Sequence, residues 1–207
     1  MKCKSKLVFI ILLLTMTTSI LPLAIQRTEA RTEQIFDSNN KDLKVSLEAP
    51  NSWNSGIISQ TIAKLNWRLN GLTATNDDLS AFFAVVNLPS LAKMALPVGE
   101  KTGLLSLIIG HYVTVNGESD VSLSDGTKAH KYSITVTTEQ LHNLKAPIDK
   151  GFDAFLLTTN QQGGSYIIIY AAQQGRLGEF SGVLENILKS VRFGEVAFSS
   201  GGTTSTS

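Results

Sequence analysis

Residues 152–172 read FDAFLLTTNQQGGSYIIIYAA, and this stretch decides the fold class. Its two ends, FDAFLL at 152–157 and YIIIYAA at 166–172, are apolar at nearly every position. Successive side chains of a strand point to opposite faces of a sheet, so apolar residues at consecutive positions predict strands covered on both faces. A third segment of this kind is AFFAVV at 81–86. The sequence therefore predicts a sheet with a layer of helices on each side.

Other segments alternate between apolar and polar residues, which is typical of strands with one wet face. Alternation at 43–47 ends in the turn APNSW at 49–53, and a second alternating segment spans 64–69. Further strands are expected near 119–123 and 127–136. The turn-rich segments SDGT and NQQGG join strands in the second half of the chain.

Two segments have the periodicity of amphipathic helices. Residues 179–193, EFSGVLENILKSVRF, place apolar side chains at helical spacing from Phe180 to Val191. Residues 99–113, GEKTGLLSLIIGHYV, show a similar stripe, which Gly103 and Gly110 weaken by about 1 kcal/mol each relative to Ala. These two helices are the predicted covers of the sheet.

The N-terminus predicts export. Lys2, Lys4 and Lys6 precede an apolar run at 7–14, and Thr28 and Ala30 are small residues at a cleavage position. This pattern predicts a secretory signal peptide at 1–30, with an uncleaved anchor over 7–25 as the alternative. Residues 31–42 are predicted as a linker, residues 43–193 as one domain, and the Ser/Thr/Gly-rich residues 194–207 as a disordered tail.

Charge and cysteine content exclude some functions. Without residues 1–30, Lys and Arg fall from 18 to 14 and Asp and Glu from 17 to 16, a net charge of −2. This balance argues against binding to nucleic acid or directly to an anionic membrane. The single cysteine, Cys3, lies in the targeting segment, so the exported part is expected to have no disulfide.

The segment around SDGT at 124–127 is the strongest candidate for chemistry. Asp120, Asp125 and His130 could form a metal or acid–base site, or they could belong to a plain hairpin. Asp-Gly is a strong hairpin signal, through a type I′ turn, and His130 begins a face that continues with Tyr132 and Ile134. The sequence favours the hairpin, with His130 at the rim of the core making one hydrogen bond.

No other catalytic pattern is present in the sequence. His111 and His142 have no spacing typical of metal ligands, although three distant histidines could still assemble a zinc site. Asp77 and Asp78 indicate a solvated turn, because the calcium-loop pattern is absent. The nucleophile elbow, the phosphate-binding loop and the dinucleotide fingerprint are absent as well.

The order of several motifs resembles the PsbP family. These are LEAPNSW at 47–53, SDGTKAHKY at 124–132, the Gly-Phe and YIIIY hairpin at 151–170, and the helix pattern ending in SVRF at 193. The pattern is most similar to the exported PsbP-like proteins of ammonia-oxidising archaea. The resemblance implies a Mog/PsbP-like fold, an α+β three-layer α/β/α sandwich around a mainly antiparallel sheet. The resemblance implies calcium as a possible cofactor, and no other cofactor is expected.

The resemblance also implies a function outside the membrane and without catalysis. The expected function is an accessory domain that docks on a membrane or cell-envelope protein. One alternative is a carrier of a small apolar ligand, held in a groove beside the helix at 99–113. Another is a hydrolase or metalloenzyme built on Asp120, Asp125 and His130.

Overall fold

A computed structural model describes residues 33–37, 43–62, 67–87, 113–143, 150–161 and 164–194. The predicted signal peptide, the helix predicted at 99–113 except for Val113, and the tail beyond Gly194 lie outside these residues.

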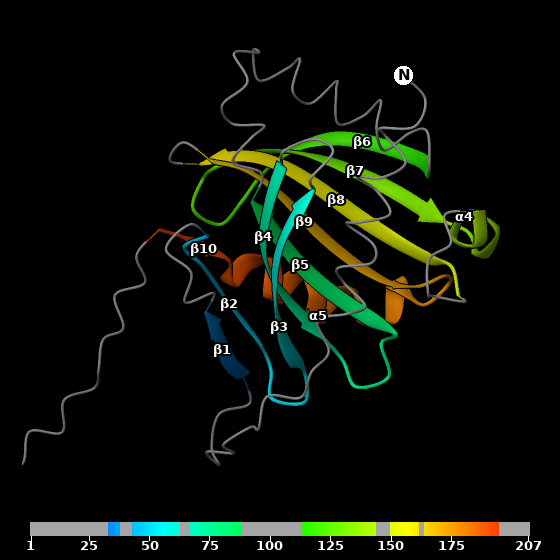
Figure 1. The fold of residues 1–207 in the computed structure, drawn as a ribbon. Coiled ribbons are helices and arrows are strands. Elements are labelled where there is room, and N and C mark those ends of the chain that lie inside the picture. Colours follow the sequence, from blue (N-terminus) through cyan, green and yellow to red (C-terminus); the bar gives the residue numbers. More distant parts are fainter. Residues whose placement is uncertain are drawn as a thin grey trace, which may run out of the picture.

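The main feature is a seven-stranded sheet in which every pairing is antiparallel (Figure 1). The strand order is β3-β4-β5-β9-β8-β7-β6. Its strands are β3 (Asn54–Ile62), β4 (Trp67–Thr75), β5 (Ala81–Asn87), β6 (Thr114–Ser122), β7 (Lys128–Val136), β8 (Phe152–Gln161) and β9 (Gly164–Gln173). The three apolar segments of the sequence are the neighbouring strands β5, β9 and β8 at the centre, as their composition predicts.

A second, three-stranded sheet has the order β1-β2-β10. Its strands are β1 (Glu33–Asp37), β2 (Val45–Pro50) and β10 (Arg192–Phe193), and both pairings are antiparallel. The prediction of a linker over 31–42 is therefore wrong for Glu33–Asp37, which pair with residues 46–50 of β2. In this polar segment Phe36 is buried and the neighbouring Ile35 is exposed, which is compatible with a strand that has one wet face.

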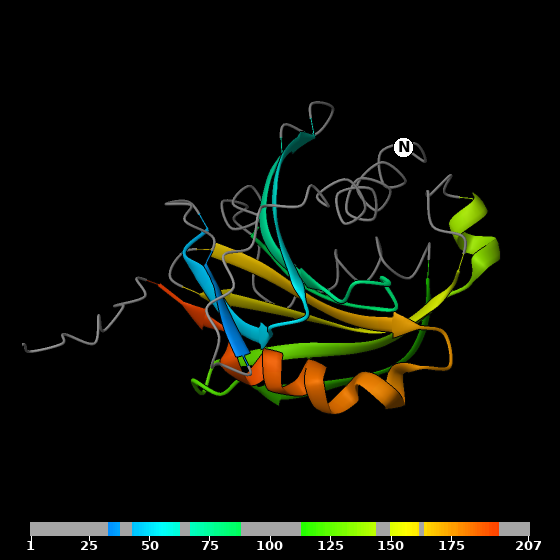
Figure 2. The same ribbon diagram turned by 90° about the horizontal axis from the view of Figure 1, so that it is seen from below.

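The helix α5 (Leu177–Ser190) covers one face of the large sheet together with the small sheet (Figure 2). Leu184 and Ile187 of α5 pack in one core with Tyr170, Ile168 and other side chains of the central strands. The helix predicted at 179–193 is thus confirmed, but it ends earlier. Val191 leaves the helical conformation, and Arg192 and Phe193 pair with β2.

The opposite face of the large sheet is also buried. Leu156, Ile169 and Ile134 alternate with the side chains that face α5, and each is at most 6% exposed. Two covered faces agree with the apolar runs of β5, β8 and β9. The helix predicted to cover this second face, at 99–113, falls outside the described residues, so the observed fold is a mainly antiparallel sheet with a helix on one face.

A short helix that the sequence does not predict, α4 (Thr138–Asn143), follows β7. Thr137 and Gln140 close its first turn through reciprocal hydrogen bonds between the backbone N–H of each and the side chain of the other. Within the described part of the chain, neither α4 nor α5 has the length and apolar character that a membrane crossing requires.

Candidate functional site

The hairpin of β6 and β7 positions the candidate residues. Leu123 and Thr127 close a three-residue loop of Ser124, Asp125 and Gly126. The Gly126 N–H donates to the Leu123 carbonyl at 2.9 Å, and Gly126 alone in the loop has a positive φ, of 82°. A type I turn followed by a left-handed glycine has this form. The hairpin is confirmed, but the type I′ turn is wrong.

The loop length decides which residues meet across the hairpin. A two-residue type I′ turn at Asp125 and Gly126 would place Val121 opposite His130. The three-residue loop places Asp120 there instead. Since a one-residue slip sends each side chain to the other face, the turn type determines whether His130 meets a carboxylate.

His130 contacts two carboxylates of β6. Its Nδ1 lies 2.7 Å from Oδ1 of Asp120, and its Nε2 lies 3.4 Å from Oε2 of Glu118. The prediction that His130 makes one hydrogen bond at the rim of the core is therefore wrong, because its imidazole contacts two carboxylates. The imidazole also makes an edge contact with the Tyr132 ring, with centroids 4.7 Å apart. We call Glu118, Asp120 and His130 the hairpin cluster.

The electrostatics of the hairpin cluster favour a protonated histidine. Partial burial opposes the charge on His130, but hydrogen bonds and charge interactions with Asp120 and Glu118 outweigh it and raise the pKa of His130 above its usual 6.5. The carboxylates themselves face solvent, since the side chain of Asp120 is 89% exposed and that of Glu118 is 65% exposed. The cluster thus consists of two exposed carboxylates around one imidazole, and their charge favours the protonated form of that imidazole.

Glu118 is the residue that sequence reasoning missed. It lies two positions before Asp120, so both carboxylates share one face of β6. This spacing is the signal in the sequence that could have found it.

Asp125 does not belong to the hairpin cluster. Its Oδ1 accepts the Thr127 N–H at 2.9 Å inside the loop, so this contact stabilises the turn.

His142 is exposed in the last turn of α4, and His111 lies outside the described residues. Within the ranges that the structure describes, no three side chains of His, Cys, Asp or Glu are grouped so that they could hold a metal ion.

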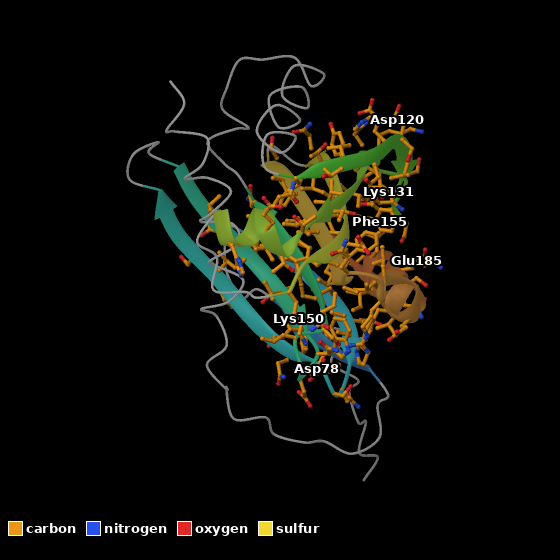
Figure 3. All side chains as sticks on the ribbon, turned by 90° about the vertical axis from the view of Figure 1, so that its right-hand side faces the viewer. Asp78, Asp120, Lys131, Lys150, Phe155 and Glu185 are labelled. Atoms are coloured by element: carbon orange, nitrogen blue, oxygen red, sulfur yellow. The ribbon has the colours of Figure 1, made fainter. Side chains whose placement is uncertain are left out.

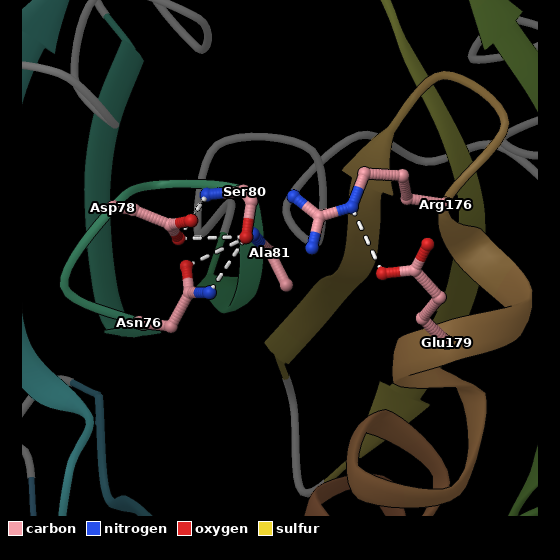
Figure 4. Close-up of polar contacts among 6 residues, drawn as sticks. All are labelled: Asn76, Asp78, Ser80, Ala81, Arg176 and Glu179. Carbon is pink, nitrogen blue, oxygen red and sulfur yellow. Dashed lines mark hydrogen bonds and ion pairs between the residues drawn. The ribbon is translucent and has the colours of Figure 1, made fainter.

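Asp77 and Asp78 lie in the turn between β4 and β5. Figure 4 shows the contacts of Asp78. The Asp78 carboxylate accepts the Ser80 hydroxyl at 2.6 Å and the Ser80 N–H at 3.1 Å, and these bonds lower the pKa of Asp78. Asp77 accepts a hydrogen bond from the Asn54 amide at 2.8 Å. Both carboxylates thus accept hydrogen bonds from neighbouring protein groups. They lie in an exposed turn, as the sequence predicts.

Lys131 lies on the opposite face of β7 from His130, beside α5 (Figure 3). Its ammonium is 3.7 Å from the centroid of the Phe155 ring. Burial lowers the pKa of Lys131, and the charge of Glu185 on α5 partly opposes that effect. This lysine fills the side of the core that α5 leaves half-covered, and its long stem suits such a position.

The chemistry available to the hairpin cluster is recognition of positive charge. Two exposed carboxylates with room for further hydrogen bonds can accept from guanidinium or ammonium groups. Both imidazole nitrogens of His130 already contact carboxylates. Each N–H of the protonated ring therefore has an acceptor within the cluster.

Comparison with solved structures shows a PsbP-like fold. The solution structure of cyanobacterial PsbP (CyanoP) from Synechocystis sp. PCC 6803 aligns with a TM-score of 0.50 at 10% identity, over 84% of this chain and 100% of that one. A crystal structure of PA94, a protein of unknown function from Pseudomonas aeruginosa, aligns with a TM-score of 0.46 at 8% identity, over 80% of this chain and 100% of that one. No family profile and no curated protein matches the sequence.

Proposed function

We propose that this chain is an exported, non-catalytic accessory domain that docks on a membrane or cell-envelope protein. Export rests on the signal-peptide pattern of residues 1–30, and the accessory role on the PsbP-like fold together with the exposed acidic hairpin cluster. The proposal includes the three-layer α/β/α arrangement, which is supported by the burial of Leu156 and Ile169 on the face away from α5.

The observation that carries the docking proposal is the exposure of two carboxylates on an edge strand. Residues 114–120 of β6 are exposed throughout, and Asp120 lies at the outer side of the hairpin (Figure 3). Exposed carboxylates gain little from a pairing within the chain, because water screens it. They gain more from a complementary surface that excludes water. The partner chemistry is therefore a basic protein surface rich in Arg or Lys.

Charge reversal on the hairpin tests this proposal. The double variant Glu118→Lys, Asp120→Lys is compared with Glu139→Lys, Glu185→Lys, which makes the same change in net charge at exposed positions of α4 and α5. Retention of each protein on envelope membranes from the source cells is measured at low salt. We expect the hairpin variant to lose at least about tenfold in retention, or about 1.4 kcal/mol, and the control to be retained like the wild type. Equal retention of both variants would overturn the proposal.

A further inference from the structure

The two edges of the large sheet differ in their protection. An edge strand presents unpaired backbone N–H and C=O groups, and proteins usually block such edges with charges, prolines or bulges. Among the described strands of the large sheet, β6 and β3 are the two that pair on one side alone. These two strands differ in whether they carry features that block pairing with another strand.

The β6 edge carries two of these devices. Its register with β7 shifts between Val115 and Gly117, which marks a bulge or irregularity. It also carries the negative charges of Glu118 and Asp120 on one face. A second copy of β6 placed beside this strand would bring like charges together.

The β3 edge carries none of them. Its nine residues, NSGIISQTI, include no charged residue and no proline. They pair with β4 in unbroken register from Asn54 to Ile62. Ile57 is 44% exposed, and isoleucine is a residue type that favours strands. This is a long, regular and uncharged edge of the kind that pairs with another strand.

The shape of the large sheet sets the β3 edge apart from its other described strands. The hairpin of β3 and β4 curves away from the other described strands at its far end (Figure 2). The β6 edge lies at the other end of the strand order, six strands away. A partner on β3 would therefore leave the hairpin cluster uncovered.

We propose that β3 is the pairing edge for a second copy of this chain, which forms an antiparallel β3–β3 contact around a twofold axis. The absence of charged residues from β3 favours a second copy of this chain as the partner. A strand without charged residues can lie antiparallel to itself with no like-charge contact, whereas β6 cannot. Twofold dimers with the same patch on both subunits are the commonest oligomers of soluble proteins. The axis near Ile57 would bury this side chain against its copy, and the two large sheets would become continuous.

The test uses the full chain and measures its oligomeric state by sedimentation over a range of concentrations. Ile57→Lys and Ile57→Glu each place a like charge on both sides of the axis. Each should raise the dimer dissociation constant by about tenfold or more. An equal mixture of the two variants should restore dimers, because opposite charges then face one another. The matched control is Val115→Lys, at an exposed valine of the β6 edge, which should dimerise like the wild type.

Three outcomes would overturn the proposal. The first is a wild-type chain that stays monomeric at all concentrations. The second is a dimer that neither Ile57 variant weakens, which would place the contact elsewhere. The third is a loss of dimers that mixing does not reverse in variants whose thermal melts match the wild type. Because the hairpin cluster is not changed in these variants, envelope retention can fail or persist independently of dimerisation.

Discussion

Nδ1 of His130 lies 2.7 Å from Oδ1 of Asp120, directly across the antiparallel ladder of β6 and β7. The pairing joins the histidine of the hairpin cluster to one of the two exposed carboxylates of that cluster. It therefore sets both the charge of this surface and its dependence on pH.

Asp120→Asn should lower the pKa of His130. The raised pKa of His130 means that its protonation stabilises the folded state. This contribution is fully present below the unfolded pKa of about 6.5 and is lost as the pH rises through the higher folded pKa. In Asp120→Asn the contribution shrinks, by at most about 1 kcal/mol for a pair this exposed. NMR titration of the imidazole and denaturant unfolding at pH 5.5 and pH 8.5 check this.

Ser119→Asn serves as the control, since it changes a neighbouring exposed residue of β6 and leaves the carboxylates in place. An imidazole that titrates identically in the wild type and in Asp120→Asn would contradict the assigned contact.

Gly126→Ala and Gly182→Ala should change stability in opposite directions. Gly126 has a φ of 82°, a conformation that costs an L-residue about 1–2 kcal/mol, so the alanine variant is destabilised. Gly182 lies inside α5 with nothing within 4 Å of an added Cβ, and alanine there should stabilise by up to about 1 kcal/mol. Urea unfolding of the pair measures both. A Gly126→Ala variant as stable as the wild type would rule out the three-residue loop with its left-handed glycine.

Leu184→Ala should be the most damaging truncation in α5. The Leu184 side chain is fully buried between the helix and the sheet, so its loss leaves a cavity and costs about 2–5 kcal/mol. Asn186→Ala, two positions away on the exposed side of α5, should change stability by less than about 0.5 kcal/mol. Thermal unfolding compares the two, and similar melting temperatures would show that α5 does not pack as described.

The buried centre of the fold could be predicted from the sequence, and the edge strand β3 could not. Strands β8 and β9 and the helix α5 bury many apolar side chains, so their periodicity is strong. In the edge strand β3, Ile58 is buried and the adjacent Ile57 is exposed, and the sequence of the strand shows no clear alternation. An edge strand exposed to water needs no apolar pattern, and a six-residue helix such as α4 is too short to show one.

The hairpin cluster depends on a detail that composition does not determine. The sequence predicts the hairpin and names Asp120 and His130, yet their contact requires the three-residue loop that sets the register. Asp-Gly is compatible with both loop lengths, and only the backbone conformation of Asp125 distinguishes them. Glu118 enters the cluster through the same register.

The most direct test of the docking account is photocrosslinking from the hairpin in intact cell envelopes. A photoreactive residue at Ser119, between Glu118 and Asp120, is compared with one at Asn186 on the exposed side of α5. The account predicts one protein adduct from position 119, through a segment rich in Arg or Lys. That adduct should disappear when Glu118→Lys is added and should be absent from position 186. No adduct at position 119, or the same adducts from both positions, would contradict a docking role for the hairpin.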